Sequence, residues 1–421
     1  MKIKDFELYK DLAKGALIKW SLFLKWVVAA GVIGIVVGLV GTAFSYGMQW
    51  VTEVREKYPQ ILLGLPLAGL LIVLLYHLAK RDNDKGTNSV LLAVRSKEAL
   101  PIVMAPLIFI STLLTHLCGG SAGREGAALQ LGGSIGNGLG KLFKMKSGDV
   151  HVMVMCGMSA CFAALFGTPL AAAVFSLEVV NVGIMYYSAL VPCVLSALIA
   201  VGIARGFGVP SEAMTILEIP EFGFFDAGRV LLLAMLCAVI SINFCLILQF
   251  TANQGKRWLP NPAVRIVVAG LVIIGLTALV GTTDYLGAGM HVIERSVVHG
   301  EVSWPAFLFK ILFTAITLGA GFKGGEIVPS FFVGATFGCL MGGLLGLPPS
   351  LGAAVGMIAV FCGVTNSPIT SLLIGLELFG MDAAWYFIIA VGVSYMLSGY
   401  HSLYHTQRIV HSKYEMEDND V

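Results

Sequence analysis

Two charged residues stand side by side in the apolar, glycine-rich stretch CGGSAGREGAALQLGGSIGNGLG, residues 118–140. They are Arg124 and Glu125. An ionisable residue inside a hydrophobic segment is costly, and its position is usually functional. The surrounding glycines predict a helix that begins near residue 124 and leaves its first backbone N–H groups free. The first turn of such a helix carries a partial positive charge and attracts anions.

A second stretch, KGGEIVP at residues 323–329, predicts an equivalent helix opening, with the helix starting near residue 327. Two openings that converge inside a membrane would stabilise an anion without a fixed cation, which would hold the ion too tightly to release it. The predicted anion-binding backbone groups are the N–H groups of Arg124, Glu125, Gly126, Glu326, Ile327 and Val328.

Glu125 is interpreted as a tethered carboxylate that competes with the anion for these donors. It occupies the site when ionised and leaves it when protonated, which would link proton uptake to anion entry. The alternative is that Glu125 only caps a helix or pairs with a base elsewhere in the chain. For Arg124 a structural role is expected, in which its guanidinium satisfies loop carbonyl groups.

The elements that must position these residues are membrane helices. The 421-residue chain is 57% hydrophobic and 12% charged, whereas soluble proteins carry about 25% charged residues. Runs long enough to cross a bilayer occur, for example, at 27–44, 61–79, 230–250 and 263–281. We therefore predict an all-α, polytopic (multi-pass) membrane protein. The net charge of +2 indicates no nucleic-acid partner, and the eight cysteines lack the spacing of metal ligands or disulfides, so no metal and no cofactor are expected.

Lysine and arginine are concentrated in the N-terminal 20 residues and in the 80–97 loop, which places both in the cytoplasm. A stripe of apolar residues predicts an amphipathic helix over 1–20 on the inner membrane surface, formed by Ile3, Phe6, Leu12 and Trp20. Residues 21–405 are expected to form one transmembrane domain, and 406–421 a polar tail. No cytoplasmic regulatory domain is expected.

Internal similarity divides the domain into pseudo-repeats at roughly 21–206 and 229–405. The segment TPLAAAVFSLEVV (168–180) aligns with SPITSLLIGLELF (367–379), and 123–136 resembles 324–338. Several apolar segments are short or interrupted by Gly and Pro, at 124–143, 150–166, 169–181, 349–363 and 368–380. Repeats with broken helices are typical of transporters whose site lies at the repeat interface.

The motifs GREGA (123–127), GGEIVP (324–329) and SLYHTQR (402–408) resemble, in order and spacing, the three signature regions of the CLC family of anion channels and anion/proton antiporters. The resemblance implies the CLC-type inverted repeat with broken helices and a homodimer with one pore per subunit. It also implies that Glu125 is the gate and proton carrier. Tyr404, carried by the last helix, would donate its hydroxyl to the central anion.

Four departures from the chloride-type pattern are present. Ala127 replaces a proline, and GTNSVL (86–91) replaces the G-S-G-I-P loop, so that Asn88 or Ser89 stands where a serine binds the anion. Val179 occupies the position of an inner proton-relay glutamate. Glu326 stands in the second opening, where chloride-type members are apolar. This combination resembles the fluoride-exporting branch of the family.

The departures suit a small, strongly hydrated anion. An amide at Asn88 offers two donors where a hydroxyl offers one, and Glu326 would supply the proton-accepting group that position 179 lacks. The alternative for Asn88 is a helix cap, and for Glu326 a carboxylate in a water-filled vestibule. Glu178 and Glu377 are further proton-relay candidates, but their matching positions after prolines favour a structural role at helix ends.

The expected function is proton-coupled anion antiport, with fluoride/proton exchange exporting fluoride from the cytoplasm across the cell membrane. The same-family alternative is a chloride channel or chloride/proton antiporter, and a more distant one is an organic-anion transporter. GGSAG (119–123) also fits the G-x-S-x-G pattern of serine hydrolases, but that motif needs a preceding strand. No catalytic residue is assigned to the chain, and no enzyme activity is expected.

Overall fold

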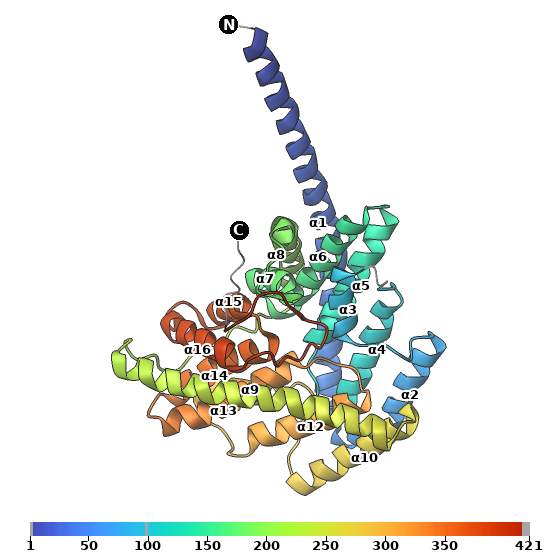
Figure 1. Ribbon diagram of the computed structural model, residues 1–421. Coiled ribbons are helices and arrows are strands. Elements are labelled where there is room, and N and C mark those ends of the chain that lie inside the picture. Colours follow the sequence, from blue (N-terminus) through green and yellow to red (C-terminus); the bar gives the residue numbers. More distant parts are fainter. Residues whose placement is uncertain (1–2, 97–99, 415–421) are drawn as a thin grey trace.

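The structure, a computed structural model, describes residues 3–96 and 100–414, with side chains described from residue 14 onward. Helices dominate (Figure 1), so the predicted all-α polytopic fold is confirmed. The first half contains α1 (Ile3–Lys57), α2 (Leu65–Leu78), α3 (Thr87–Arg95), α4 (Met104–Leu117), α5 (Glu125–Leu142), α6 (Ser147–Phe166), α7 (Pro169–Glu178) and α8 (Leu190–Gly206), with 3-10 turns η1 (Pro59–Gly64) and η2 (Tyr187–Ala189).

The second half begins with α9 (Phe224–Trp258), which lies across the body in Figure 1. It continues with α10 (Pro262–Val280), α11 (Met290–Glu294), the π-helical turn η3 (Arg295–His299), α12 (Ala306–Ala320), α13 (Ile327–Leu344), α14 (Pro349–Thr365), α15 (Pro368–Phe379) and α16 (Ala384–Leu397). Two short strands, β1 (Asn181–Val182) and β2 (Arg408–Ile409), pair in parallel, with Asn181 opposite Arg408.

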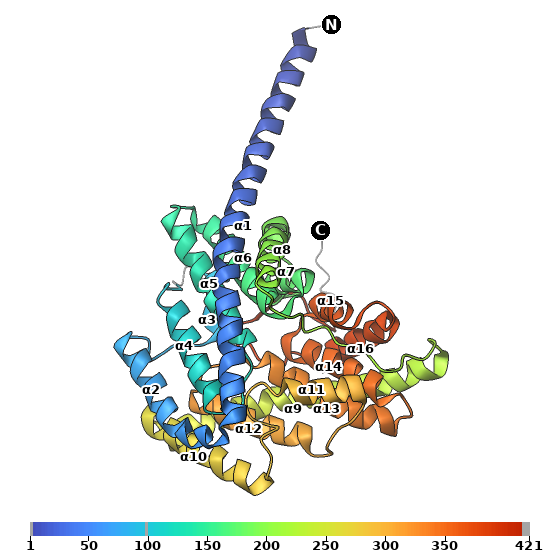
Figure 2. The same cartoon turned by 180° about the vertical axis from the view of Figure 1, so that it is seen from behind.

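Seven helices among the described residues are long and apolar enough to cross a membrane. The first of them, α1, runs from Ile3 to Lys57 without a break, and its N-terminal part projects from the body (Figures 1 and 2). The predicted amphipathic helix over 1–20 is therefore continuous with the first span. The side chains of Ile3, Phe6 and Leu12 lie outside the described ones, and Trp20 is exposed.

Two helix pairs occupy corresponding places in the two halves, α5 with α6 and α13 with α14. Glycines line both contacts, and a Cβ atom on Gly132 would overlap the carbonyl of Gly157, just as one on Gly338 would overlap that of Gly352. Small residues allow helix backbones to approach this closely inside a membrane. The close contacts hold the start of α5 and the start of α13 rigidly toward the centre of the molecule.

The short helices predicted from Gly and Pro are present as α5, α7, α14 and α15, whereas α6 begins at Ser147 and, at 20 residues, is long enough to cross a membrane. They form the interior, and every residue of α14 from Ser350 to Thr365 is buried. Backbone ends of short helices are tolerated at this depth because neighbouring protein covers them.

Residues 398–414, the described part of the chain after α16, form no helix, and they turn back into the protein. The Leu403 N–H donates to the carbonyl of Val364 (2.9 Å), and Val410 N–H donates to Val182 (3.0 Å). Tyr404 is buried in this segment. The expectation that Tyr404 lies on the last helix is therefore wrong. Hydrogen bonds to distant residues hold this segment in an extended conformation, which lets it reach β1 where a helix would be too short.

Candidate anion site

The two predicted helix openings are joined directly by their backbones. Gly123 and Gly325 form an isolated antiparallel bridge in which each N–H donates to the other's carbonyl at 2.7 Å. A Cβ atom on Gly325 would overlap the N–H of Gly126, and one on Gly123 would overlap the Glu125 carboxylate. Glycine is required here by this close approach. The bridge brings the starts of α5 and α13 together, as the sequence predicts.

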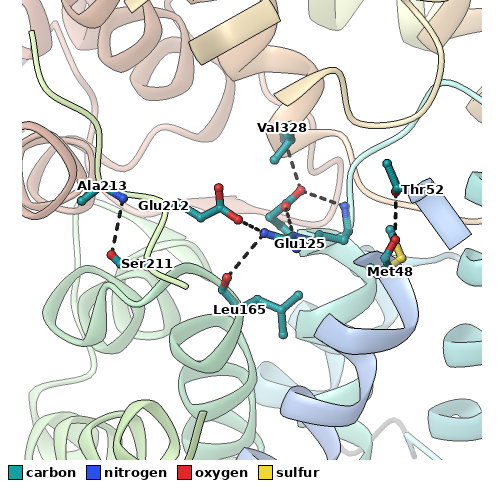
Figure 3. Close-up of polar contacts among 9 residues, drawn as sticks. Met48, Thr52, Glu125, Leu165, Ser211, Glu212, Ala213 and Val328 are labelled. Carbon is teal, nitrogen blue, oxygen red and sulfur yellow. Dashed lines mark hydrogen bonds and ion pairs between the residues drawn. The ribbon is translucent and has the colours of Figure 1, made fainter. Parts of the chain in front are cut away.

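Glu125 occupies the donors of both openings. Its Oε2 atom accepts hydrogen bonds from the backbone N–H of Arg124 (3.0 Å) and from that of Val328 in α13 (3.3 Å). Figure 3 shows the carboxylate between these two elements, and the residue is fully buried. Two of the backbone groups predicted to bind the anion, those of Arg124 and Val328, therefore bind the Glu125 carboxylate in this conformation.

Arg124 lies between Glu125 and the carboxylate of Glu212, a residue far away in the sequence. Its Nη2 atom donates to Glu212 and, at 3.5 Å, to the carbonyl of Leu165 at the end of α6 (Figure 3). Its Nε atom lies 3.7 Å from Glu125 Oε1, which has no hydrogen-bond partner. The expected bonds to loop carbonyl groups are replaced by one bond to a carbonyl in the last turn of α6 and by an ion pair. The ion pair with Glu212 is new, since nothing in the sequence near either residue indicates it.

Glu326 and Tyr404 meet Glu125 in the same interior region. Glu326 is the N-cap residue of α13, in the position that Arg124 has before α5. The Glu326 Oε2 atom and the Tyr404 hydroxyl are both buried and have no hydrogen-bond partner. The Tyr404 hydroxyl is close enough to interact electrostatically with the carboxyl groups of both Glu326 and Glu125. These unsatisfied polar atoms are unusual in a folded protein, and they are groups that an anion or a proton could engage.

A third helix start, that of α3, approaches the same region. Its N-cap, Gly86, has a φ of +61°, in the left-handed region that favours glycine. A Cβ atom on Gly126 would lie 2.9 Å from the Thr87 hydroxyl and 3.4 Å from Glu326 Oε2. Thr87, which no sequence motif indicates, therefore lies beside Gly126, the second glycine of GREGA, and precedes Asn88.

Asn88 is held by the C-terminal segment. Its Oδ1 atom accepts hydrogen bonds from the Thr406 N–H (3.1 Å) and from the Thr406 hydroxyl (2.9 Å). A backbone N–H can only donate, so the side-chain oxygen must face Thr406 and the NH₂ group must face the other way. Ser89, the alternative at this position, instead donates its hydroxyl to Asp84 Oδ1 at 3.4 Å.

Lys413 fastens the end of the segment that carries Tyr404. Its ammonium group donates to Asn366 Oδ1 (2.6 Å) and to the carbonyl of Tyr395 (2.8 Å). Burial lowers the pKa of Lys413 to about 8. The Asn366 amide in turn donates to Gln407 (3.2 Å). The segment is thus tied to the ends of α14 and α16, and Tyr404 is fixed between them.

Glu178 and Glu377 cap each other's helices. The Glu178 carboxylate, at the end of α7, accepts from the N–H groups of Ile369 (3.0 Å) and Thr370 (2.8 Å) in the first turn of α15. The Glu377 carboxylate, in α15, accepts from Leu170 (3.1 Å) and Ala171 (2.9 Å) in the first turn of α7. The structural role at helix ends is confirmed, because a carboxylate at a helix start satisfies free N–H groups.

The serine-hydrolase motif at 119–123 and its neighbour His116 have structural partners. His116 is buried, and its Nδ1 atom is 3.0 Å from the carbonyl of Thr112. Ser121 follows helix α4 rather than a strand, and its hydroxyl is 3.0 Å from that of Thr314. The G-x-S-x-G match at 119–123 is therefore not a nucleophile elbow.

Known proteins resemble this chain in sequence and in fold. The family model described as voltage gated chloride channel matches residues 68–399. The chain belongs to the CLC family. A chloride/fluoride channel protein from Pseudomonas syringae pv. tomato is 34% identical over 397 residues, covering 93% of this chain and 88% of the relative. The H(+)/Cl(-) exchange transporter ClcA of Vibrio cholerae is 25% identical, covering 82% of this chain and 80% of the relative.

A solved structure described as a CLC-type fluoride/proton antiporter superposes with a TM-score of 0.88 at 31% identity, covering 92% of this chain and 98% of that one. A slow cyanobacterial Cl-/H+ antiporter has a TM-score of 0.77 at 21% identity, which bears on the fold alone. These comparisons point to membrane transport rather than catalysis, in a multi-pass helical CLC protein.

The reciprocal caps lead to a prediction that distinguishes a structural role of Glu178 and Glu377 from a role in proton relay. We expect Glu178→Ala and Glu377→Ala each to lower the free energy of unfolding by about 2 kcal/mol, because each removes hydrogen bonds to a charged acceptor. The ratio of proton to anion flux should stay at the wild-type value. Thermal unfolding in detergent and paired flux assays measure the two quantities, with the exposed Glu218→Ala as control. A changed flux ratio at unchanged stability would assign a relay role instead.

Proposed function

We propose that this protein is a proton-coupled anion antiporter that exports fluoride from the cytoplasm in exchange for protons. The observation that carries the proposal is the Glu125 carboxylate, which sits on N–H donors at the starts of both α5 and α13. An anion would need the same donors. Occupation by Glu125 and occupation by an anion are therefore mutually exclusive at this point.

The exchange follows from the chemistry of a carboxyl group. An ionised carboxylate is a strong acceptor for backbone N–H groups, whereas a protonated one has lost its charge and competes poorly. Protonation of Glu125 therefore frees the donors of Arg124 and Val328 for the anion. When the anion leaves, the deprotonated carboxylate returns. Each cycle moves a proton and an anion through one site without a fixed buried cation.

Fluoride as the substrate is supported by two kinds of observation. The relatives include a chloride/fluoride channel protein and a CLC-type fluoride/proton antiporter. Within the chain, Thr406 fixes the Asn88 amide through its oxygen, and we propose that its NH₂ group supplies donors to the anion. A small anion loses much hydration energy on entering a protein, and two donors replace more of its water than a hydroxyl can.

Chloride is the second candidate substrate. It is supported by the relation to the H(+)/Cl(-) exchange transporter of Vibrio cholerae. The two candidates are distinguished by comparing the rates of fluoride and chloride efflux from proteoliposomes, with and without a pH gradient.

Glu326 is proposed as the second proton-transfer group. Val179 cannot titrate, and the Glu326 carboxyl lies beside Gly126 with a buried oxygen that has no hydrogen-bond partner. A carboxyl group next to the anion path could receive the proton that Glu125 releases.

The proposed assembly is a homodimer with one pore per subunit in the cell membrane, with the N terminus in the cytoplasm. The orientation is supported by the basic residues of 2–19 and of the 80–97 loop.

Glu125→Gln tests the gate. The amide cannot exchange a proton with the anion path, so uphill fluoride movement on a proton gradient should be lost while downhill anion movement continues. Fluoride and proton fluxes are measured together in proteoliposomes, with the exposed Glu218→Gln as the matched control. Uphill pumping by the Glu125→Gln protein would rule out the gate assignment.

Asn88→Ser tests selectivity. The fluoride-over-chloride permeability ratio should fall by about tenfold, since losing one hydrogen bond to a charged group costs roughly 1.5 kcal/mol. Thr406→Val, which removes one of the two bonds that orient Asn88, should lower the ratio by less. The ratio is read from competing efflux of the two anions. An unchanged ratio in Asn88→Ser would move the determinant elsewhere, beginning with Thr87.

Glu326→Gln tests the second proton group. Proton flux should slow by a larger factor than fluoride flux, because the amide keeps the shape of the side chain but cannot carry a proton. Both fluxes are recorded from the same vesicles, and gel filtration checks that the oligomer is intact. A wild-type rate and ratio would leave Glu326 as a structural cap of α13.

A further inference from the structure

The non-helical linker 207–223 between α8 and α9 is anchored to helices of both halves. The Met214 N–H donates to the carbonyl of Leu378 in α15 (2.9 Å), and the Leu217 N–H donates to the hydroxyl of Ser350 in α14 (2.8 Å). Nearer its start, the Glu212 N–H donates to the carbonyl of Phe166 at the end of α6 (3.4 Å). These bonds hold the Glu212 side chain beside Arg124 and Glu125, as Figure 3 shows.

Arg124 stands between two carboxylates and hydrogen-bonds to only one of them. Its guanidinium donates to Glu212, whereas it forms only a longer ion pair with Glu125 Oε1, whose 3.7 Å separation from Nε is too long for a hydrogen bond. Glu125 Oε1 is left buried without a partner. If Glu212 did not hold it, the guanidinium could turn to this oxygen, since a charge-assisted bond there would satisfy both groups.

The solvent exposure of the three side chains increases from Glu125 to Arg124 to Glu212. The side chain of Glu125 is 0% exposed, that of Arg124 14% and that of Glu212 21%. Glu212 can therefore be reached from the solvent, although the gate itself cannot. Removing its charge would leave an unbalanced guanidinium next to the gate.

We propose that Glu212 is a positioning residue for the gate: it holds Arg124 away from Glu125 and offsets its charge, so that Glu125 can take up a proton and leave the anion site. This inference rests on the proposed function, because it concerns the same gate. It adds a residue from a different segment, 87 positions along the chain from Glu125.

The groups that face Glu125 come from four elements. Arg124 precedes α5, Glu212 lies in the linker, Glu326 precedes α13, and Tyr404 belongs to the C-terminal segment. Of these, only Glu212 has a contact with Arg124 that competes with Glu125. A change confined to Glu212 therefore alters the charge next to the gate without removing a group from the anion site.

The test measures fluoride-driven proton flux against pH in proteoliposomes containing the full-length protein. For Glu212→Gln we expect the half-maximal rate to move by about one pH unit toward acid, since an unbalanced opposite charge within a few ångströms favours the ionised gate by at least that much. Near neutral pH this corresponds to about a tenfold slower flux. Glu212→Ala should show the same shift, and Glu212→Asp should keep most of the wild-type profile.

Two controls separate this role from a structural one. Glu218→Gln removes the same charge from an exposed position of the same linker and should leave the profile unchanged. In a Glu125→Gln background, where proton coupling is lost and only downhill anion movement remains, Glu212→Gln should leave the pH profile of downhill fluoride flux unchanged. The proposal is overturned if Glu212→Gln and Glu212→Ala follow the wild-type profile, if Glu218→Gln shifts it equally, or if the shift persists without Glu125.

Failure of the proposed function would look different. Wild-type protein that moves no fluoride on a proton gradient would refute fluoride antiport itself. The same pH titration run on chloride flux would then still decide the role of Glu212.

Discussion

The site depends on the pair of backbone hydrogen bonds between Gly123 and Gly325. This bridge brings two helix starts from opposite halves of the chain so close that one carboxylate, Glu125, reaches donors of both. Side chains at either glycine would separate the helix starts. Because helix ends present oriented N–H groups, the bridge creates an electropositive point in a membrane interior without placing a cation there.

The interior helices make this bridge possible. The glycine-lined contacts of α5 with α6 and of α13 with α14 set the direction of each helix, and the reciprocal caps of Glu178 and Glu377 fasten α7 to α15 across the halves. Each of these contacts covers or hydrogen-bonds backbone N–H and C=O groups that lipid could not hydrogen-bond. Backbone groups of the C-terminal segment are satisfied in the same way, because hydrogen bonds to β1, Asn88 and Val364 hold its extended path.

The basic side chain beside the site, Arg124, is neutralised by a neighbouring carboxylate. Arg124 is offset by Glu212, while Glu125 uses backbone donors and Glu326 has a buried oxygen without a partner. An anion site with a full buried cation would bind tightly and release slowly. The proposed site, made of helix ends, an amide and a tyrosine hydroxyl, would instead exchange its occupant, with the Glu125 carboxylate as the proposed competitor.

The sequence alone determined the membrane class, the interrupted helices, the two helix openings and the pseudo-symmetric glutamates, because composition, glycine and proline act over a few neighbouring residues. It also indicated Glu125, Glu326 and the Asn88 position through local motifs. Only the tertiary structure decided the contacts between distant segments. Glu212 meets Arg124 across 88 positions and Thr406 meets Asn88 across 318, and Tyr404 lies in an extended segment rather than a helix. These outcomes depend on how whole helices pack, which no local pattern encodes.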